Sequence, residues 1–314
     1  MSNLLLPLEL SRAPAVGERG GRSVRGVAHR LRFYLAVTDP KSVSLLVFTA
    51  LASGVIAGGL HAPARLLGIL LALALSCMGA RAVANYIDRD IDALMERTRR
   101  RPLPSGQLPP AHALVLGSGL IAAGLLLAVT FGPLIVLLIS LGLADNLIVY
   151  ALLTKRTSPL SIVLGAPSGG APAFVGYVAV AGGITLPGIL LATFVMLWTP
   201  IHIWSLAIRS RDDYARAGIL MLPVAIGVPR TARYIGLASL ALAGFTVLFL
   251  VAPGAHVVLP IASVVLGLVV ALVLGSVWLR RAPTKEHAWT LFKFTSPYLA
   301  LLFLLLAVNA IVIG

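Results

Sequence analysis

The strongest constraint on this chain is a succession of long apolar stretches. A helix needs about 20 mostly apolar residues to cross the hydrocarbon of a bilayer. The runs are continuously apolar rather than alternating, which favours helices over a membrane barrel. We place nine spans at 43–60, 64–87, 111–131, 133–153, 160–181, 187–208, 231–252, 256–279 and 290–313. The sequence therefore predicts an all-α, polytopic membrane bundle of about nine transmembrane helices.

Composition supports a lipid environment. Only 11% of the 314 residues are charged, whereas soluble domains usually carry about 25%. A chain of this length with so few charges has too little polar surface to face water, so we expect a lipid bilayer around it.

The net charge of +14 is explained by where the charges lie. The connections after the third, fifth and seventh spans hold no charged residue, and the one after the first span holds only Arg65. Short cytoplasmic loops are enriched in Lys and Arg. The charges gather in the other connections, namely Asp88–Arg101, Lys155–Arg156, Arg209–Arg233 and Arg280–Lys285. We expect these loops and the N-terminus to be cytoplasmic at the inner (plasma) membrane, and the C-terminus to lie on the opposite side. No nucleic-acid partner is needed to explain the charge.

The chain divides into two regions by composition. Residues 1–40 are polar and rich in arginine, glycine and proline, and they lack the compact apolar core of a secretory signal. We expect a mobile cytoplasmic tail here that ends in an interfacial helix near Leu31–Val37. Residues 41–314 form the predicted transmembrane domain.

The end of the second span carries a first acidic cluster. If the helix continues, Asn85, Asp88 and Asp92 fall at positions i, i+3 and i+7 on one face, with Asp90 roughly opposite. Mg²⁺ is usually held by one or two carboxylates together with substrate phosphates. The cluster therefore suggests a magnesium–diphosphate site. The alternative is a solvated acidic helix end among compensating arginines.

The end of the sixth span repeats this design with Asp212 and Asp213 among arginines. Two such ends facing one another would hold Mg²⁺ around one diphosphate, with Asp88, Asp92, Asp212 and Asp213 as ligands. Guanidinium groups suit phosphate because they meet it with two parallel hydrogen bonds. The candidate diphosphate-binding bases are Arg97, Arg101, Lys155, Arg156 and Arg211. For each base, a simple topology signal is an equally good explanation.

A diphosphate site beside an apolar bundle fits one substrate shape. A polyprenyl diphosphate would place its head among cations and its tail between helices. Metal and guanidinium groups would stabilise the leaving diphosphate while the allylic C–O bond ionises. An electron-rich acceptor would then capture the carbocation, so no protein nucleophile is required.

With these residues in view, the chain resembles the UbiA superfamily of membrane prenyltransferases, and within it the protoheme IX farnesyltransferase branch. The resemblance is carried in order over residues 80–225. The first block is Asn85–Asp92 with Met95–Thr98 and Arg101–Leu103, and the second is Lys155–Thr157 with Pro159 and Ile162–Val163. The third block is Trp198–Pro200 with His202 and Trp204, and the fourth is Asp213–Tyr214 with Ala217–Ile219 and Met221–Val224.

The resemblance implies a helical bundle around a central cavity open toward the cytoplasmic side. It also implies Mg²⁺ dependence, farnesyl diphosphate and haem B as substrates, and haem O as product. A haem A synthase is an implied partner. Carried over by motif, Asp88 and Asp92 would hold Mg²⁺ and diphosphate, Asn85 would support them, and Asp213 would serve the second motif.

Two other functions and one residue stay open at this point. A UbiA-type enzyme acting on an aromatic quinone precursor, or an ion-coupled transporter using the acidic residues as relays, would also place carboxylates in a membrane bundle.

His202 lies in a span, where an ionisable group is a functional candidate. It is a candidate haem contact or ligand, and a hydrogen-bonded packing histidine is the alternative.

Overall fold

A computed structural model describes residues 24–251 and 257–313, which are helical or in turns and contain no strand. Ten helices form the bundle and six shorter ones connect or extend them. The ten are α1 (Val24–Thr38), α2 (Pro40–Ile56), α3 (Pro63–Ile87), α5 (Pro110–Val129), α6 (Pro133–Ala144), α8 (Ala166–Ala181), α9 (Leu186–Arg209), α12 (Val228–Val251), α13 (Leu259–Arg281) and α14 (Lys285–Ile313). The six are η1 (Gly59–His61), α4 (Arg89–Leu94), the π-helix η2 (Asp145–Thr154), α7 (Ser161–Leu164), α10 (Arg211–Arg216) and α11 (Leu222–Ala225).

The predicted number of spans agrees with the structure. Within residues 24–251 and 257–313, eight helical segments are each long and apolar enough to cross a membrane, and a ninth is formed if the bent pair α1–α2 counts as one span. The chain is therefore a multi-pass membrane protein. The two members of the bent pair meet at 49°. Asp39, between them, is the only non-glycine residue with positive φ (45°) in the described ranges.

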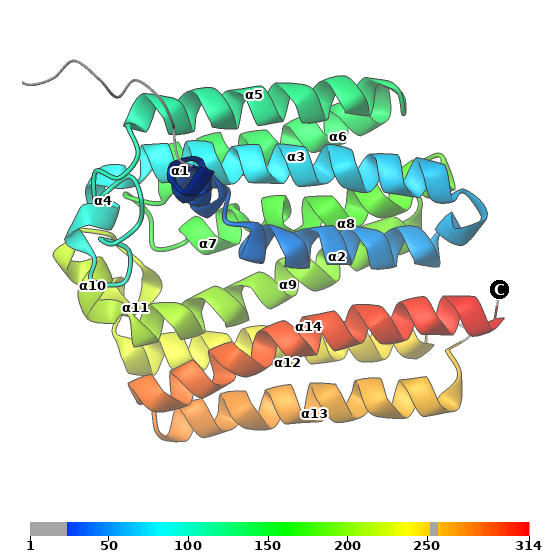
Figure 1. The fold of residues 1–314 in the computed structure, drawn as a ribbon. Coiled ribbons are helices and arrows are strands. Elements are labelled where there is room, and N and C mark those ends of the chain that lie inside the picture. The colour runs from blue at the N-terminus through cyan, green and yellow to red at the C-terminus, as the bar shows by residue number, and fades with distance from the viewer. Residues whose placement is uncertain (1–23, 252–256, 314) are drawn as a thin grey trace, which may run out of the picture.

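The long helices other than α1 lie side by side, α1 is seen end-on, and the short helices α4, α10 and α11 gather at one end of the bundle (Figure 1). The C-terminus lies at the other end. Hence the two acidic loops, which are far apart in sequence, lie at the same end. The assignment of this end to the cytoplasmic side of the membrane stays a prediction. Residues 1–23, where most of the predicted tail falls, lie outside the described residues, and α1 contains the predicted Leu31–Val37 helix.

Small residues allow the helices to approach closely. A Cβ atom at Gly79 of α3 would stand 2.6 Å from the carbonyl oxygen of Gly117 on α5. Membrane helices gain little from hydrophobic contact with one another and rely on such close packing. Any side chain at Gly79 would push α3, the helix that ends at the first acidic cluster, away from its neighbour.

Several boundaries differ from the prediction for local reasons. The first span ends at Ile56 rather than near residue 60, because Gly58 turns the chain with φ +88°. The fifth is broken at Gly165, between α7 and α8, and Pro172 is accommodated inside α8. The fourth ends in a π-helix, which the apolar pattern alone does not reveal. Such wide turns often lie at functional sites, and this one ends directly before Lys155.

Candidate active site

Asp88 stands at the junction of α3 and α4 and is 7% exposed. Its Oδ2 forms an ion pair with Lys155 Nζ, at the end of η2. Its Oδ1 is buried and accepts no hydrogen bond from the described part of the chain. A buried, unpaired carboxylate oxygen costs free energy until a cation or donor satisfies it. Asp88 Oδ1 is therefore able to accept one further hydrogen-bond donor or cation.

Asp92 lies one turn further, is 5% exposed, and is bonded to a second base. Arg101 Nη1 lies 2.8 Å from Asp92 Oδ2 and 3.2 Å from Asn85 Oδ1. The Asn85 amide in turn donates to the backbone oxygen of Val37 at 2.7 Å. Arg101 thus joins two members of the predicted triad, and Asn85 ties them to α1.

The predicted face is confirmed. The backbone nitrogen of Asp92 donates to the oxygen of Asp88 at 2.8 Å, so helical hydrogen bonding runs through the junction. Asp90 points to the outside, with 59% of its side chain exposed. Arg156 holds it with two hydrogen bonds of 2.7 Å. These bonds keep the pKa of Asp90 below its usual value.

The second acidic loop contacts the first one directly. Asp213 accepts hydrogen bonds from the backbone N–H groups of Glu96 and Arg97, at 3.3 and 3.2 Å, and is paired with Arg216. The side chain of Asp213 is 13% exposed. The two loops therefore converge as expected, but through a carboxylate bound to backbone rather than through four carboxylates facing each other.

The remaining predicted residues of this loop have partners of their own. Lys285 Nζ lies 2.6 Å from Asp212 Oδ2, and the Asp212 side chain is 58% exposed. Arg211 donates through Nε to the backbone oxygen of Pro223 at 3.0 Å, which ties α10 to α11. Burial raises the pKa of Tyr214, whose side chain also lies near Arg97. Ligand roles for Arg97, Arg211 and Asp212 stay predictions.

A polar pocket of about 530 Å³ opens between the two loops and α14. Asp88 and Asp92 are not among its lining residues. The pocket is lined by Glu96, Arg97, Leu206, Arg209, Ser210, Asp212, Asp213, Arg216, Lys285 and Trp289.

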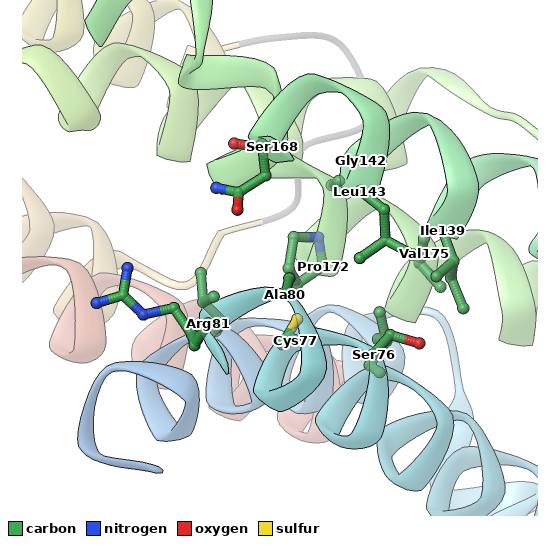
Figure 2. A pocket seen from close by; sticks show the side chains of 14 residues that line it. Ser76, Cys77, Ala80, Arg81, Ile139, Gly142, Leu143, Ser168, Pro172 and Val175 are labelled. Carbon is green, nitrogen blue, oxygen red and sulfur yellow. The ribbon is translucent and has the colours of Figure 1, made fainter. Parts of the chain in front are cut away.

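A second, apolar cavity of about 60 Å³ lies among α2, α3, α6, η2 and α8. Figure 2 shows Cys77 and Ala80 of α3 across from Pro172 of α8, with Arg81 at one end. Arg81 is two helical turns before Asp88. Its Nη2 is paired with Asp39 at 2.6 Å, while Asp145 accepts from the Ser168 backbone at 2.8 Å. Arg81 is thus paired with Asp39, and Asp145 is bound by the backbone of Ser168.

The described residues contain no group of three or more His, Cys, Asp or Glu side chains arranged to hold a metal ion by themselves. This arrangement suits Mg²⁺, which keeps water or phosphate oxygens among its ligands. Asp88 and Asp92 would supply hard oxygen donors to such an ion, and the buried Asp88 Oδ1, which has no hydrogen-bond partner in the described residues, is the atom that would fit a cation.

His202 lies in α9 and is packed by aromatic rings. Its Nδ1 lies 2.7 Å from Thr295 Oγ1 of α14. The contacts fit the packing alternative, and the haem-contact role stays a prediction. Sequence reasoning assigned no role to Thr295 or Asp39, because each contacts a partner far away along the chain.

Comparison with known proteins agrees with the helical fold described above. The model of the UbiA prenyltransferase family matches residues 45–308. A protoheme IX farnesyltransferase of Desulforudis audaxviator is 44% identical over 287 residues, covering 90% of each chain. A solved structure described as a digeranylgeranylglyceryl phosphate synthase matches with a TM-score of 0.73 at 17% identity, over 90% of this chain and 99% of that one. A UbiA homologue from Archaeoglobus fulgidus, bound to GPP and Mg²⁺, matches with a TM-score of 0.60 at 17% identity, over 87% and 99%.

Proposed function

The chain belongs to the UbiA prenyltransferase family, and from this membership we propose that it transfers a farnesyl group from farnesyl diphosphate to a vinyl group of haem B, forming haem O. The observation that carries the proposal is the 44% identity, over nine-tenths of both chains, to a protoheme IX farnesyltransferase. The acidic and basic side chains at the α3–α4 junction supply the chemistry that such a reaction needs.

Diphosphate binding is assigned to the α3–α4 junction and the end of η2. Asp88 and Asp92 would hold Mg²⁺, which neutralises charge on the leaving diphosphate when bound. Lys155 and Arg101, which pair with the two carboxylates in this structure, lie where they can turn to phosphate oxygens. Arg97 and Arg156 stand at the margins of the same site, and Arg211, Asp212 and Asp213 belong to the second loop.

The apolar tail would extend between helices away from this head group. The face of α3 that carries Asp88 continues through Arg81 to the apolar cavity of Figure 2. This cavity, of about 60 Å³, is smaller than a farnesyl chain, so α3 and α8 would have to move apart to admit the tail. Burial between the helices would remove apolar surface from water, which favours binding. Ionisation of the allylic C–O bond then leaves a carbocation in a site with few nucleophiles, so the haem vinyl group can capture it.

The proposed location is the inner (plasma) membrane. The charged connections and the N-terminus would be cytoplasmic and the C-terminus would lie on the opposite side, because Lys and Arg concentrate in the loops at the α4–α10 end. The central cavity would open toward that side. A haem A synthase is the expected partner for the product. We assign residues 1–40 to a cytoplasmic tail and 41–314 to the catalytic domain.

The test is product identification. Purified protein in lipid is given haem B, farnesyl diphosphate and Mg²⁺, and the porphyrins are analysed by mass spectrometry. Haem O is the expected product, formed only when all three are present. A prenylated quinone precursor in a mixed-acceptor assay, or ion flux without prenyl transfer, would contradict the proposal. Asp88→Asn is the matched negative control.

A further inference from the structure

The imidazole of His202 is covered on both faces. The Trp198 ring stacks on it with centroids 4.4 Å apart and planes at 17°, and the Phe292 ring does so at 4.3 Å and 25°. Two near-parallel rings at these separations would collide if they shared one face. The imidazole therefore lies between them, and only its edge is open to a further partner.

The hydrogen bonds around Thr295 determine which ring nitrogen carries the proton. The Thr295 hydroxyl donates to the backbone oxygen of Phe292 at 2.7 Å. A hydroxyl has one proton to give, so the 2.7 Å contact with His202 Nδ1 requires that Nδ1–H be the donor. In the neutral ring, Nε2 then keeps its lone pair. Trp198 Nε1 also donates to the Thr295 carbonyl oxygen at 2.7 Å, and this bond again joins α9 to α14.

His202 lies about one helical turn from the lining of the polar pocket. Leu206 and Arg209, which line the pocket, follow His202 at i+4 and i+7 on one face of α9. Leu206 is about 6 Å from His202 along the helix axis. On α14, Trp289 lines the pocket and stacks on Phe292 at 5.1 Å. A continuous row of rings thus runs from the pocket wall to His202.

The proposed reaction needs a base that has not yet been assigned. Haem O carries a hydroxyl that haem B lacks, so a water molecule must be added together with the farnesyl group. The pocket carboxylates Asp212, Asp213 and Glu96 are already paired, with Lys285, Arg216 and Arg99 respectively. The Nε2 lone pair of His202 accepts no hydrogen bond from the described residues. The narrow edge between two rings admits water more readily than a macrocycle.

Resting on the function proposed above, we propose that His202 is the catalytic base that takes the proton from this water. The allylic C–O bond breaks and diphosphate leaves with the electron pair of that bond, and the vinyl π pair then bonds to C1 of the farnesyl cation. The positive charge is then on the vinyl carbon attached to the porphyrin. Water oxygen bonds to this carbon and one of its protons passes to Nε2. The flanking rings stabilise the imidazolium through cation–π contact, and water in the pocket then removes the proton.

The test compares His202→Gln with His287→Gln. The glutamine amide can still donate to Thr295 but is a poor base. His287 is the matched control, because its Nδ1 is also hydrogen-bonded, to Ala282 O at 2.7 Å, and its ring also contacts a tryptophan, Trp278, at 3.6 Å. We expect His202→Gln to lower the rate of haem O formation by about 10²–10⁴-fold, as loss of a general base does. The KM for farnesyl diphosphate should stay near the wild-type value. The remaining product should be enriched in farnesylated porphyrin that lacks the added water.

A second variant, Thr295→Val, keeps the side-chain volume and removes the acceptor that fixes the tautomer. As a positioning residue, it should shift the product ratio in the same direction but less. Wild-type rates and products for His202→Gln would overturn the proposal. So would a loss of spectroscopically titrated haem B affinity large enough to explain the slower rate, since His202 would then be a haem contact. If the wild-type protein itself makes no haem O, the proposed function fails and the role of His202 fails with it.

Discussion

The two acidic loops look alike in sequence but are built differently. In the first loop, Asp88 and Asp92 are 7% and 5% exposed and point inward. In the second, the Asp212 side chain is 58% exposed, and Asp213 is used to bind the backbone of the first loop. The first loop therefore resembles a binding site and the second a support that shapes it.

Electrostatic balance explains how the first loop tolerates two buried carboxylates. Each one has its own base, Lys155 for Asp88 and Arg101 for Asp92. Removing one partner of a buried ion pair usually lowers the free energy of unfolding by about 3–5 kcal/mol, because the remaining charge is left without compensation. The bases thus keep the acidic residues folded inward, and a magnesium–diphosphate complex would offer both groups new partners of the right charge.

The largest expected effect separates the two loops by activity. Asp88→Asn and Asp92→Asn should each reduce prenyl transfer by about 10³-fold or more, because each removes a charged ligand from the point where leaving-group charge develops. Asp212→Asn should stay within a few-fold of wild type. The measurement is the initial rate of haem O formation, with size-exclusion profiles to check folding. Equal losses for Asp88→Asn and Asp212→Asn would contradict the difference between the loops.

The next effect concerns ligand binding without turnover. Inorganic pyrophosphate with Mg²⁺ should raise the unfolding midpoint of the wild-type protein. At a ligand concentration 100 times its Kd, binding should add about 2.7 kcal/mol to the free energy of unfolding. The shift should be absent in Asp88→Asn, which lacks the unpaired Oδ1 charge, and retained in Asp212→Asn. Thermal unfolding in detergent, with and without EDTA, measures it. A full shift in Asp88→Asn would place the metal elsewhere.

A smaller effect tests the supporting role of Asp213. Asp213→Asn weakens two backbone hydrogen bonds to a charged acceptor, and such bonds contribute about 1.5–3 kcal/mol. We expect roughly a tenfold lower rate, since about 1.4 kcal/mol corresponds to one order of magnitude, together with faster proteolysis at Glu96–Arg97. A loss as large as that of Asp88→Asn, with the loop intact, would instead support the sequence prediction that Asp213 binds metal.

These contrasts show what sequence could and could not predict. The inward face of Asn85, Asp88 and Asp92 follows from helical spacing alone, and Asp90 is on the outside as the same spacing requires. The contact of Asp213 with the backbone of residue 96 spans 117 positions. It depends on how two loops pack, which no local pattern encodes.

The helical architecture was similarly predictable in outline and not in detail. Continuous apolar runs predicted the spans, because backbone N–H and C=O groups inside a membrane must be hydrogen-bonded within the protein, as they are in a helix. The π-helix at Asp145–Thr154 leaves no mark in the apolar pattern, and the bend at Asp39 involves tertiary contacts. Asp39, for example, is bound by Arg81 from a different helix.

The smallest effect concerns Asp90, which lies in the first loop but faces outward. Its pKa is lowered by the two hydrogen bonds from Arg156, so the pair stabilises the fold while Asp90 is ionised in both states, above its unfolded pKa of about 3.9. That stabilisation is lost as the pH falls through the lower folded value. Because the Asp90 side chain is 59% exposed, we expect the pair to contribute only about 0.2–1 kcal/mol to the free energy of unfolding.

Asp90→Asn should thus lower the unfolding midpoint slightly at pH 6, and the difference in midpoint from wild type should disappear as the pH falls below about 4. Haem O formation should be nearly unchanged at neutral pH. A large loss of activity in this variant would mean that solvent-facing and inward-facing carboxylates of the first loop share one function, and the distinction drawn from their burial would fail.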